Sequence, residues 1–128
     1  MRFSGTARLD RRTKELVQRL GRNDIAIIDH RDMDRVSAES LLESGVEVVV
    51  NAAESISGSY PNLGPLILVR GGVRLIDGVG PGIFDRVAEG ERIDVVDGEI
   101  MRQGETVASG RCWRMRCSYC ASAESRAF

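Results

Sequence analysis

The chain has 128 residues, a formal net charge of -1, 42% hydrophobic residues and 29% charged residues. This length suits one domain with its own core, and the balanced charge gives no electrostatic reason to expect nucleic acid or an acidic membrane surface as a partner. No segment approaches the roughly 20 apolar residues that cross a bilayer, so we expect no membrane span and a cytoplasmic location.

Residues 11–20 are predicted to form the first helix, with Asp10 before it and Gly21 as its C-terminal stop. The run 24–28, Asp-Ile-Ala-Ile-Ile, is short and almost wholly apolar. Such a run is typical of a strand buried on both faces, so we expect a central strand there.

A second helix is predicted after Asp32 or Asp34, either of which can act as its N-cap, and it ends at Gly45. The β-branched run 46–50 follows as a predicted strand. Strand, helix and strand in this order favour parallel pairing, because parallel strands need a crossover long enough to return over the sheet. The α/β class follows from this order.

The rest of the chain is predicted to continue the alternation and to finish in a hairpin. The expected elements are a helix over 65–69 that begins with Pro65, a strand over 73–76, a helix over 83–87, and strands over 93–96 and 99–101 joined at Asp97-Gly98. We therefore expect residues 1–110 to form a small three-layer α/β domain with a partly parallel sheet and a closing β-hairpin.

Residues 111–128 show neither helical nor alternating apolar periodicity, so they are predicted to form a disordered tail. This tail holds the three cysteines, Cys112, Cys117 and Cys120. The odd number argues against a disulfide framework, and a zinc site would lack a fourth ligand. We expect no metal and no cofactor.

The loop 51–65 leaves a predicted strand and enters a predicted helix, where free backbone N–H groups favour an anion. Its candidate ligand-binding residues are polar or glycine: Asn51, Ser55, Ser57, Gly58, Tyr60 and Asn62. The same residue types are also what an irregular structural turn needs, so both interpretations stay open. The loop lacks the lysine of a nucleotide triphosphate site.

Asp29 and His30 end the predicted central strand, where the sites of α/β proteins assemble, so they are the second pair of candidate ligand-binding residues. Two other interpretations of Asp29 and His30 are an acid–base pair and a surface or helix-capping role. Asp32 and Asp34, together with Asp29, miss the calcium-loop pattern, so capping is favoured over a cation site. No catalytic residue is assigned.

Four blocks together resemble the SteA-like cytokinetic-ring proteins of actinobacteria over about residues 5–110. The blocks are Gly5-Thr-Ala-Arg-Leu-Asp-Arg-Arg-Thr-Lys14, Asp24-Ile-Ala-Ile-Ile-Asp-His30, Asn51-Ala-Ala with Ser55-Ile-Ser-Gly58, and Tyr60-Pro-Asn-Leu-Gly-Pro65. In that family, this region precedes a thiamin pyrophosphokinase-like domain and a membrane segment, and this chain contains neither. The resemblance implies action at the division septum, with an influence on cell-wall hydrolysis.

Two positions depart from the family pattern. Ser59 stands where arginine is expected, and the pattern fades after Gly110, which a frameshift or truncation would explain. More distantly, the chain is similar to the swivelling β/β/α domain of phosphoenolpyruvate-utilising enzymes, which implies a swivelling β/β/α-like domain as the alternative to a three-layer one. The loop 51–65 lacks the histidine on which that domain is phosphorylated, so we exclude phosphotransfer by that route.

The leading hypothesis is a non-catalytic domain of a SteA-like cell-division protein that binds a phosphate-containing small ligand or a partner protein, itself a cell-division or membrane-anchored protein. The alternative is a fragment of a thiamin pyrophosphokinase-like enzyme that contributes a phosphate-binding loop. A third hypothesis is an assembly domain without a small ligand.

Overall fold

The computed structural model describes residues 2–56 and 63–113. Its strands are β1 (Arg2–Leu9), β2 (Asp24–Ile28), β3 (Val48–Asn51), β4 (Arg74–Asp77), β5 (Arg92–Val96), β6 (Glu99–Arg102), β7 (Glu105–Ser109) and β8 (Arg111–Trp113). Its helices are α1 (Thr13–Leu16), which continues into the 3-10 turn η1 (Val17–Arg19), α2 (Arg35–Glu43), α3 (Gly64–Arg70) and α4 (Ile83–Arg86).

The described strands form one mixed sheet in the order β7-β6-β5-β1-β2-β3-β4-β8. Strands β1 to β4 pair in parallel, whereas β5, β6 and β7 continue the sheet antiparallel beyond β1, and β8 pairs antiparallel with β4. The predicted α/β class, the partly parallel sheet and the closing β5–β6 hairpin are confirmed.

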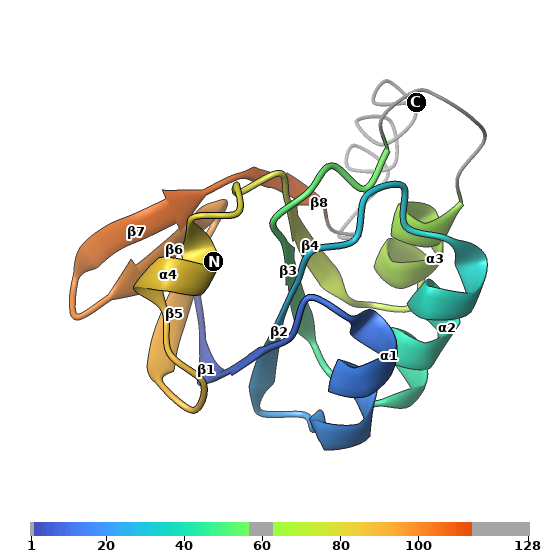
Figure 1. Ribbon diagram of the computed structural model, residues 1–128, viewed down its shortest axis with the longest axis horizontal. Helices are drawn as coiled ribbons and strands as arrows, with labels where there is room; N and C mark the ends of the chain where they lie inside the picture. Colours follow the sequence, from blue (N-terminus) through green and yellow to red (C-terminus); the bar gives the residue numbers. More distant parts are fainter. Residues whose placement is uncertain (1, 57–62, 114–128) are drawn as a thin grey trace.

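Two apolar cores lie on opposite faces of the parallel strands, and Figure 1 shows the elements that cover each face. Helices α1, α2 and α3 cover one face and bury side chains such as Leu16, Leu41 and Leu68. The other face packs against α4 and against β5, β6 and β7, whose Ile93 and Val107 join the same core as β2 and β3. The domain therefore has three layers: helices α1 to α3, the parallel strands, and the antiparallel part of the same sheet together with α4.

Strand β1 is an element that the sequence analysis did not predict, although it joins the two halves of the sheet between β2 and β5. Its inward positions include the small residues Gly5 and Ala7, which give little apolar signal. Gly5 is required because a Cβ there would lie 2.7 Å from the backbone oxygen of Asn23. A side chain larger than a hydrogen atom therefore does not fit where β1 approaches the turn before β2.

Strand β7 was also missed, because Val107 is its one core residue. Gln103 and Gly104 join it to β6 and both take positive φ, 53° and 81°. These angles suit a two-residue hairpin turn.

Two predicted boundaries are wrong. The helix expected over 11–20 is one short turn, α1, followed by η1, and Arg12 rather than Asp10 occupies its N-cap position. The predicted tail begins too early, because Arg111–Trp113 form β8 and Trp113 is only 5% exposed in the core beneath the helices. Three residues are too few to show periodicity. Residues 114–128, with Cys117 and Cys120, lie outside the described residues.

Helix α2 begins as predicted, because the carboxylate of Asp34 accepts a hydrogen bond from Ser37 N at 3.0 Å. The Ser37 side chain, and after it the Ser37 N–H, lowers the pKa of Asp34, while partial burial opposes this shift. Gly45 follows the helix with φ 82°, a conformation that glycine adopts without strain. In the described part of the chain, no helix is long and apolar enough to cross a membrane.

Candidate functional site

The parallel strands all end at one edge of the sheet, where the sites of open α/β sheets form. Asp29 and His30 follow β2 at this edge, and Asn51 and Asp77 are the last residues of β3 and β4. The structure therefore brings the two predicted sets of site residues to neighbouring strand ends (Figure 1).

Asn51 is fully buried, and its side-chain amide holds the chain that leaves β2. Its Oδ1 accepts from His30 N at 3.0 Å and from Ala53 N at 3.1 Å, while its Nδ2 donates to His30 O at 2.9 Å. These three partners are backbone groups, and Nδ2 also donates to the hydroxyl of Ser55. Asn51 thus positions the site rather than presenting its amide to a ligand.

Ser55 is also fully buried, and its hydroxyl lies between two side chains. The hydroxyl accepts from Asn51 Nδ2 at 2.7 Å and donates to Asp77 Oδ1 at 2.7 Å, and Ser55 N donates to the same oxygen at 3.0 Å. Burial raises the pKa of Asp77, while the two hydrogen bonds from Ser55 oppose the rise. A serine beside a carboxylate suggests a nucleophile, but this hydroxyl is closed to a substrate.

Asp77 was not among the predicted site residues, although an acidic residue directly after the apolar run 73–76 marks a strand end in the sequence. The remaining predicted residues of the loop, Ser57, Gly58, Tyr60 and Asn62, lie outside the described residues, and so does Ser59. The anion cradle expected of this loop therefore stays a prediction.

Asp29 and His30 do not form an acid–base pair with each other, because each side chain has another partner. Asp29 Oδ2 forms an ion pair with Arg11 Nη1 at 3.2 Å, and the Arg11 guanidinium also lies over the ring of Phe84, 4.3 Å from its centroid. His30 Nδ1 lies 3.1 Å from the hydroxyl of Thr13.

The order Thr13, His30, Asp34 resembles a nucleophile, a base and an orienting acid, but its geometry does not support catalysis. Thr13 is only 4% exposed, and His30 Nε2 lies 3.9 Å from Asp34 Oδ1, beyond hydrogen-bonding distance. The Thr13 hydroxyl instead holds the imidazole at the wall of a groove, with Nε2 as its remaining polar atom.

This groove, which we call the α1–β2 groove, is an open hollow of about 610 Å³ at the carboxyl end of the parallel strands. Its lining comes from the start of α1, the end of β2 and the first turn of α2: Arg11, Arg12, Thr13, Lys14, Glu15, Asp29, His30, Arg31 and Ser37. Four cationic side chains thus face two carboxylates. The groove is basic, although the whole chain carries a net charge of -1.

The arrangement of cations makes the groove suitable for an anion. Arg11 is committed to Asp29, and Arg31 Nε lies 4.0 Å from Asp32. Among the described residues, Arg12 and Lys14 take part in no ion pair. These two side chains are available to neutralise a ligand.

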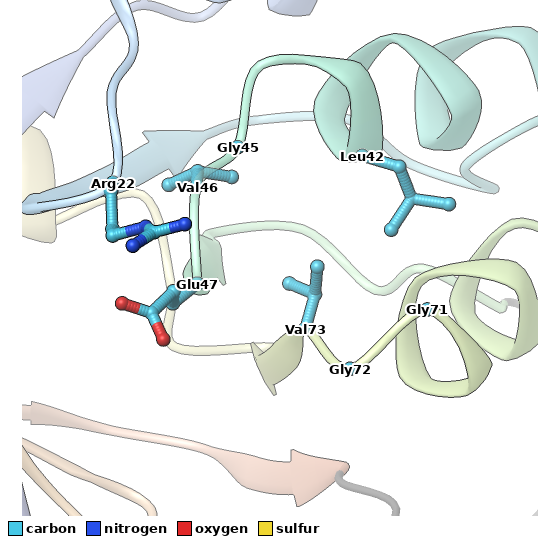
Figure 2. Close-up of a pocket in the computed structure, with 8 residues that line it drawn as sticks. All are labelled: Arg22, Leu42, Gly45, Val46, Glu47, Gly71, Gly72 and Val73. Atoms are coloured by element: carbon cyan, nitrogen blue, oxygen red, sulfur yellow. The ribbon is translucent and has the colours of Figure 1, made fainter.

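A second hollow, of about 360 Å³, lies at the opposite end of the sheet, where α2 and α3 turn into β3 and β4 (Figure 2). Its wall contains Gly45 and Gly72, both with positive φ, so the space exists because two glycine turns place no side chains there. It presents one cation, Arg22, and one anion, Glu47. This balance gives no preference for a ligand of either charge.

The cation site considered for Asp29, Asp32 and Asp34 is not formed. Asp34 caps α2 and Asp29 pairs with Arg11. Within residues 2–56 and 63–113, no group of three His, Cys, Asp or Glu side chains could hold a metal ion.

Comparisons of the chain with protein-family models, with curated proteins and with solved structures found no match.

Proposed function

We propose that this chain is a non-catalytic domain of a SteA-like cell-division protein that binds a small anionic ligand in the α1–β2 groove. The observation that carries the ligand part is the gathering of Arg11, Arg12, Lys14 and Arg31 around the Thr13-held His30. The cell-division part rests on the four sequence blocks that resemble the SteA-like family, and it extends to recruitment at the septum through a partner protein.

The charge distribution of the groove supports the binding of an anionic ligand. Guanidinium groups donate several hydrogen bonds in a plane that matches phosphate or carboxylate oxygens, and lysine adds a mobile point charge. Arg12 and Lys14 are both exposed and have no ion-pair partner among the described residues. An anion therefore gains their charge without breaking an existing ion pair.

We expect no turnover because the hydroxyl groups nearest to an acid or a base are buried. The Ser55 hydroxyl is fully buried between Asn51 and Asp77, and Thr13 is nearly so. These two hydroxyls are hydrogen-bonded to Asp77 and to His30, whereas the Ser37 hydroxyl lies beside Asp34, the carboxylate that caps α2. A substrate in the groove would reach neither of the two buried hydroxyls without rearrangement of the core.

The test is titration of the full chain with inorganic phosphate and pyrophosphate, followed by amide chemical shifts. We expect saturable shifts in Thr13, His30 and Ser37 that weaken as salt is raised, because exposed charges are screened over about 8–10 Å. The variant Arg12→Ala with Lys14→Ala should bind at least about tenfold more weakly, the equivalent of about 1.4 kcal/mol.

A matched control removes the same charge elsewhere: Arg22→Ala with Arg70→Ala deletes two exposed arginines outside the α1–β2 groove. This control should bind like the unchanged chain. Equal weakening in both double variants would mean that net charge alone attracts the anion, and the proposal would fail. Turnover of thiamin and ATP by the chain would instead favour the pyrophosphokinase-like alternative.

A further inference from the structure

The α1–β2 groove contains hydrogen-bond acceptors as well as cations. These acceptors indicate which groups the ligand has besides its negative charge. Asp29 Oδ2 is bound to Arg11, but Asp29 Oδ1 has no hydrogen bond within the described residues. Glu15 also lines the groove without an ion pair there. A ligand that carries hydrogen-bond donors could therefore bind to these two carboxylates.

The Asp29 carboxylate is held in place. Arg11 contacts it at 3.2 Å, and Arg11 is itself fixed by its position over Phe84, at 4.3 Å from the ring centroid. Phe84 belongs to α4, on the other side of the sheet from α1 to α3. A carboxylate that is oriented in this way presents its second oxygen with little loss of side-chain entropy.

A bare inorganic anion does not fit this arrangement fully, because Asp29 and Glu15 repel it while Arg12 and Lys14 attract it. The groove volume, about 610 Å³, also falls within the range of about 300–1,000 Å³ that is typical of sites for whole small molecules. Both points favour a ligand with an anionic end and a neutral part that bears donors.

We propose that the ligand is a phosphorylated polyol, that is, a phosphate ester on a carrier with free hydroxyl groups, with its phosphate at Arg12 and Lys14 and a hydroxyl donating to Asp29 Oδ1. This inference rests on the proposed function and specifies its ligand class. A sugar phosphate and a nucleotide share this chemistry, because both carry a phosphate ester and ribose-like hydroxyls.

The experiment compares affinities for inorganic phosphate, ribose, ribose 5-phosphate and AMP, using the full chain and isothermal titration. Ribose 5-phosphate or AMP should bind at least about tenfold more tightly than inorganic phosphate, and ribose alone should bind weakly. Tighter binding of AMP than of ribose 5-phosphate would identify a nucleotide, and the reverse order would identify a sugar phosphate.

Asp29→Asn tests the acceptor. It should remove most of the preference for ribose 5-phosphate over inorganic phosphate, and it should leave binding of inorganic phosphate equal or tighter because a repelling charge is gone. The matched control is Asp94→Asn, which alters another arginine-paired carboxylate, on β5 and outside the groove. This control should change neither affinity.

The two proposals fail in different ways. If no phosphate compound shifts the groove amides, the proposed function itself is overturned. If inorganic phosphate binds but ribose 5-phosphate and AMP bind no more tightly, or if Asp29→Asn weakens all of them equally, only the ligand class is wrong.

Discussion

The side-chain amide of Asn51 hydrogen-bonds to both backbone polar groups of His30, accepting from its N–H at 3.0 Å and donating to its carbonyl at 2.9 Å. One buried side chain at the end of β3 thereby fixes the backbone that follows β2. The position of His30 at the groove wall depends on a residue that does not line the groove.

Replacing Asn51 with alanine should destabilise the domain by about 1–3 kcal/mol, because it leaves buried polar groups without partners. Unfolding in urea measures this loss. Asn23→Ala is the control, since Asn23 is exposed and its side chain makes no hydrogen bond within the described residues. Equal stability of the two variants would show that the Asn51 amide is not needed to hold the strand ends together.

Asp77→Asn should be tolerated far better than Asp77→Ala. Both Ser55 N and Ser55 Oγ donate to Asp77 Oδ1, and an asparagine side chain keeps one such acceptor without a charge. Alanine removes the acceptor of both hydrogen bonds, which we expect to cost about 1–3 kcal/mol. Thermal unfolding of the two variants at neutral pH separates them, and a similar loss in both would assign the effect to the charge.

The contribution of Asp77 and Ser55 to the stability of the domain should change with pH in one direction. Burial raises the pKa of Asp77 in the folded chain above the unfolded value, about 3.8, so the folded state binds the proton more readily. Relative to Asp77→Asn, the unchanged chain should lose stability as the pH rises from below 3.8 through the raised folded pKa, and should then stay constant. A parallel pair of stability curves would contradict the assignment.

The parts of the fold that carry a strong local signal could be predicted from the sequence. The apolar run of β2, the Asp34 cap and the Asp97-Gly98 hairpin all act within a few residues, so their patterns are visible without the fold. The strands β1 and β8 were missed because their local signal is weak: the inward residues of β1 are small, β8 has three residues, and pairing with distant strands holds both in the sheet.

The site was predicted only in part, because only some of its features have a local signal in the sequence. Strand ends could be located, so Asp29, His30, Asn51 and Ser55 were named. Their roles depend on contacts across the sheet, such as Ser55 with Asp77 and His30 with Thr13, which no local pattern encodes. The cations Arg11, Arg12 and Lys14 were not named, because they form a basic groove only when the start of α1 lies beside the end of β2.

Gly5→Ala should destabilise the domain although alanine suits a strand better than glycine. A Cβ at this position would lie 2.7 Å from the backbone oxygen of Asn23 and 3.1 Å from Ile25 Cγ1. Overpacking of this kind typically costs about 1–3 kcal/mol. Gly82→Ala is the matched control, because its φ is -61° and no atom lies within 4 Å of the added Cβ. It should be neutral or stabilising by up to about 1 kcal/mol, and the order of the two melting temperatures decides the matter.

Trp113→Ala tests whether β8 belongs to the folded domain or, as the sequence suggested, to a tail. Trp113 is 5% exposed in the core beneath α1, α2 and α3 and pairs with Leu75 of β4, so its truncation should cost about 3–5 kcal/mol. Circular dichroism during urea unfolding measures the loss, and Trp113→Phe should retain part of the stability if alanine prevents folding.

The control is Val36→Ala, which shortens an apolar side chain that is 69% exposed and should change stability by less than about 0.5 kcal/mol. Trp113 is the one tryptophan of the chain, so its fluorescence reports on this position alone. A buried Trp113 should emit at shorter wavelength in the folded chain than in urea. If its emission did not shift on unfolding and Trp113→Ala were as stable as Val36→Ala, the domain would end before β8, and β4 rather than β8 would form that edge of the sheet.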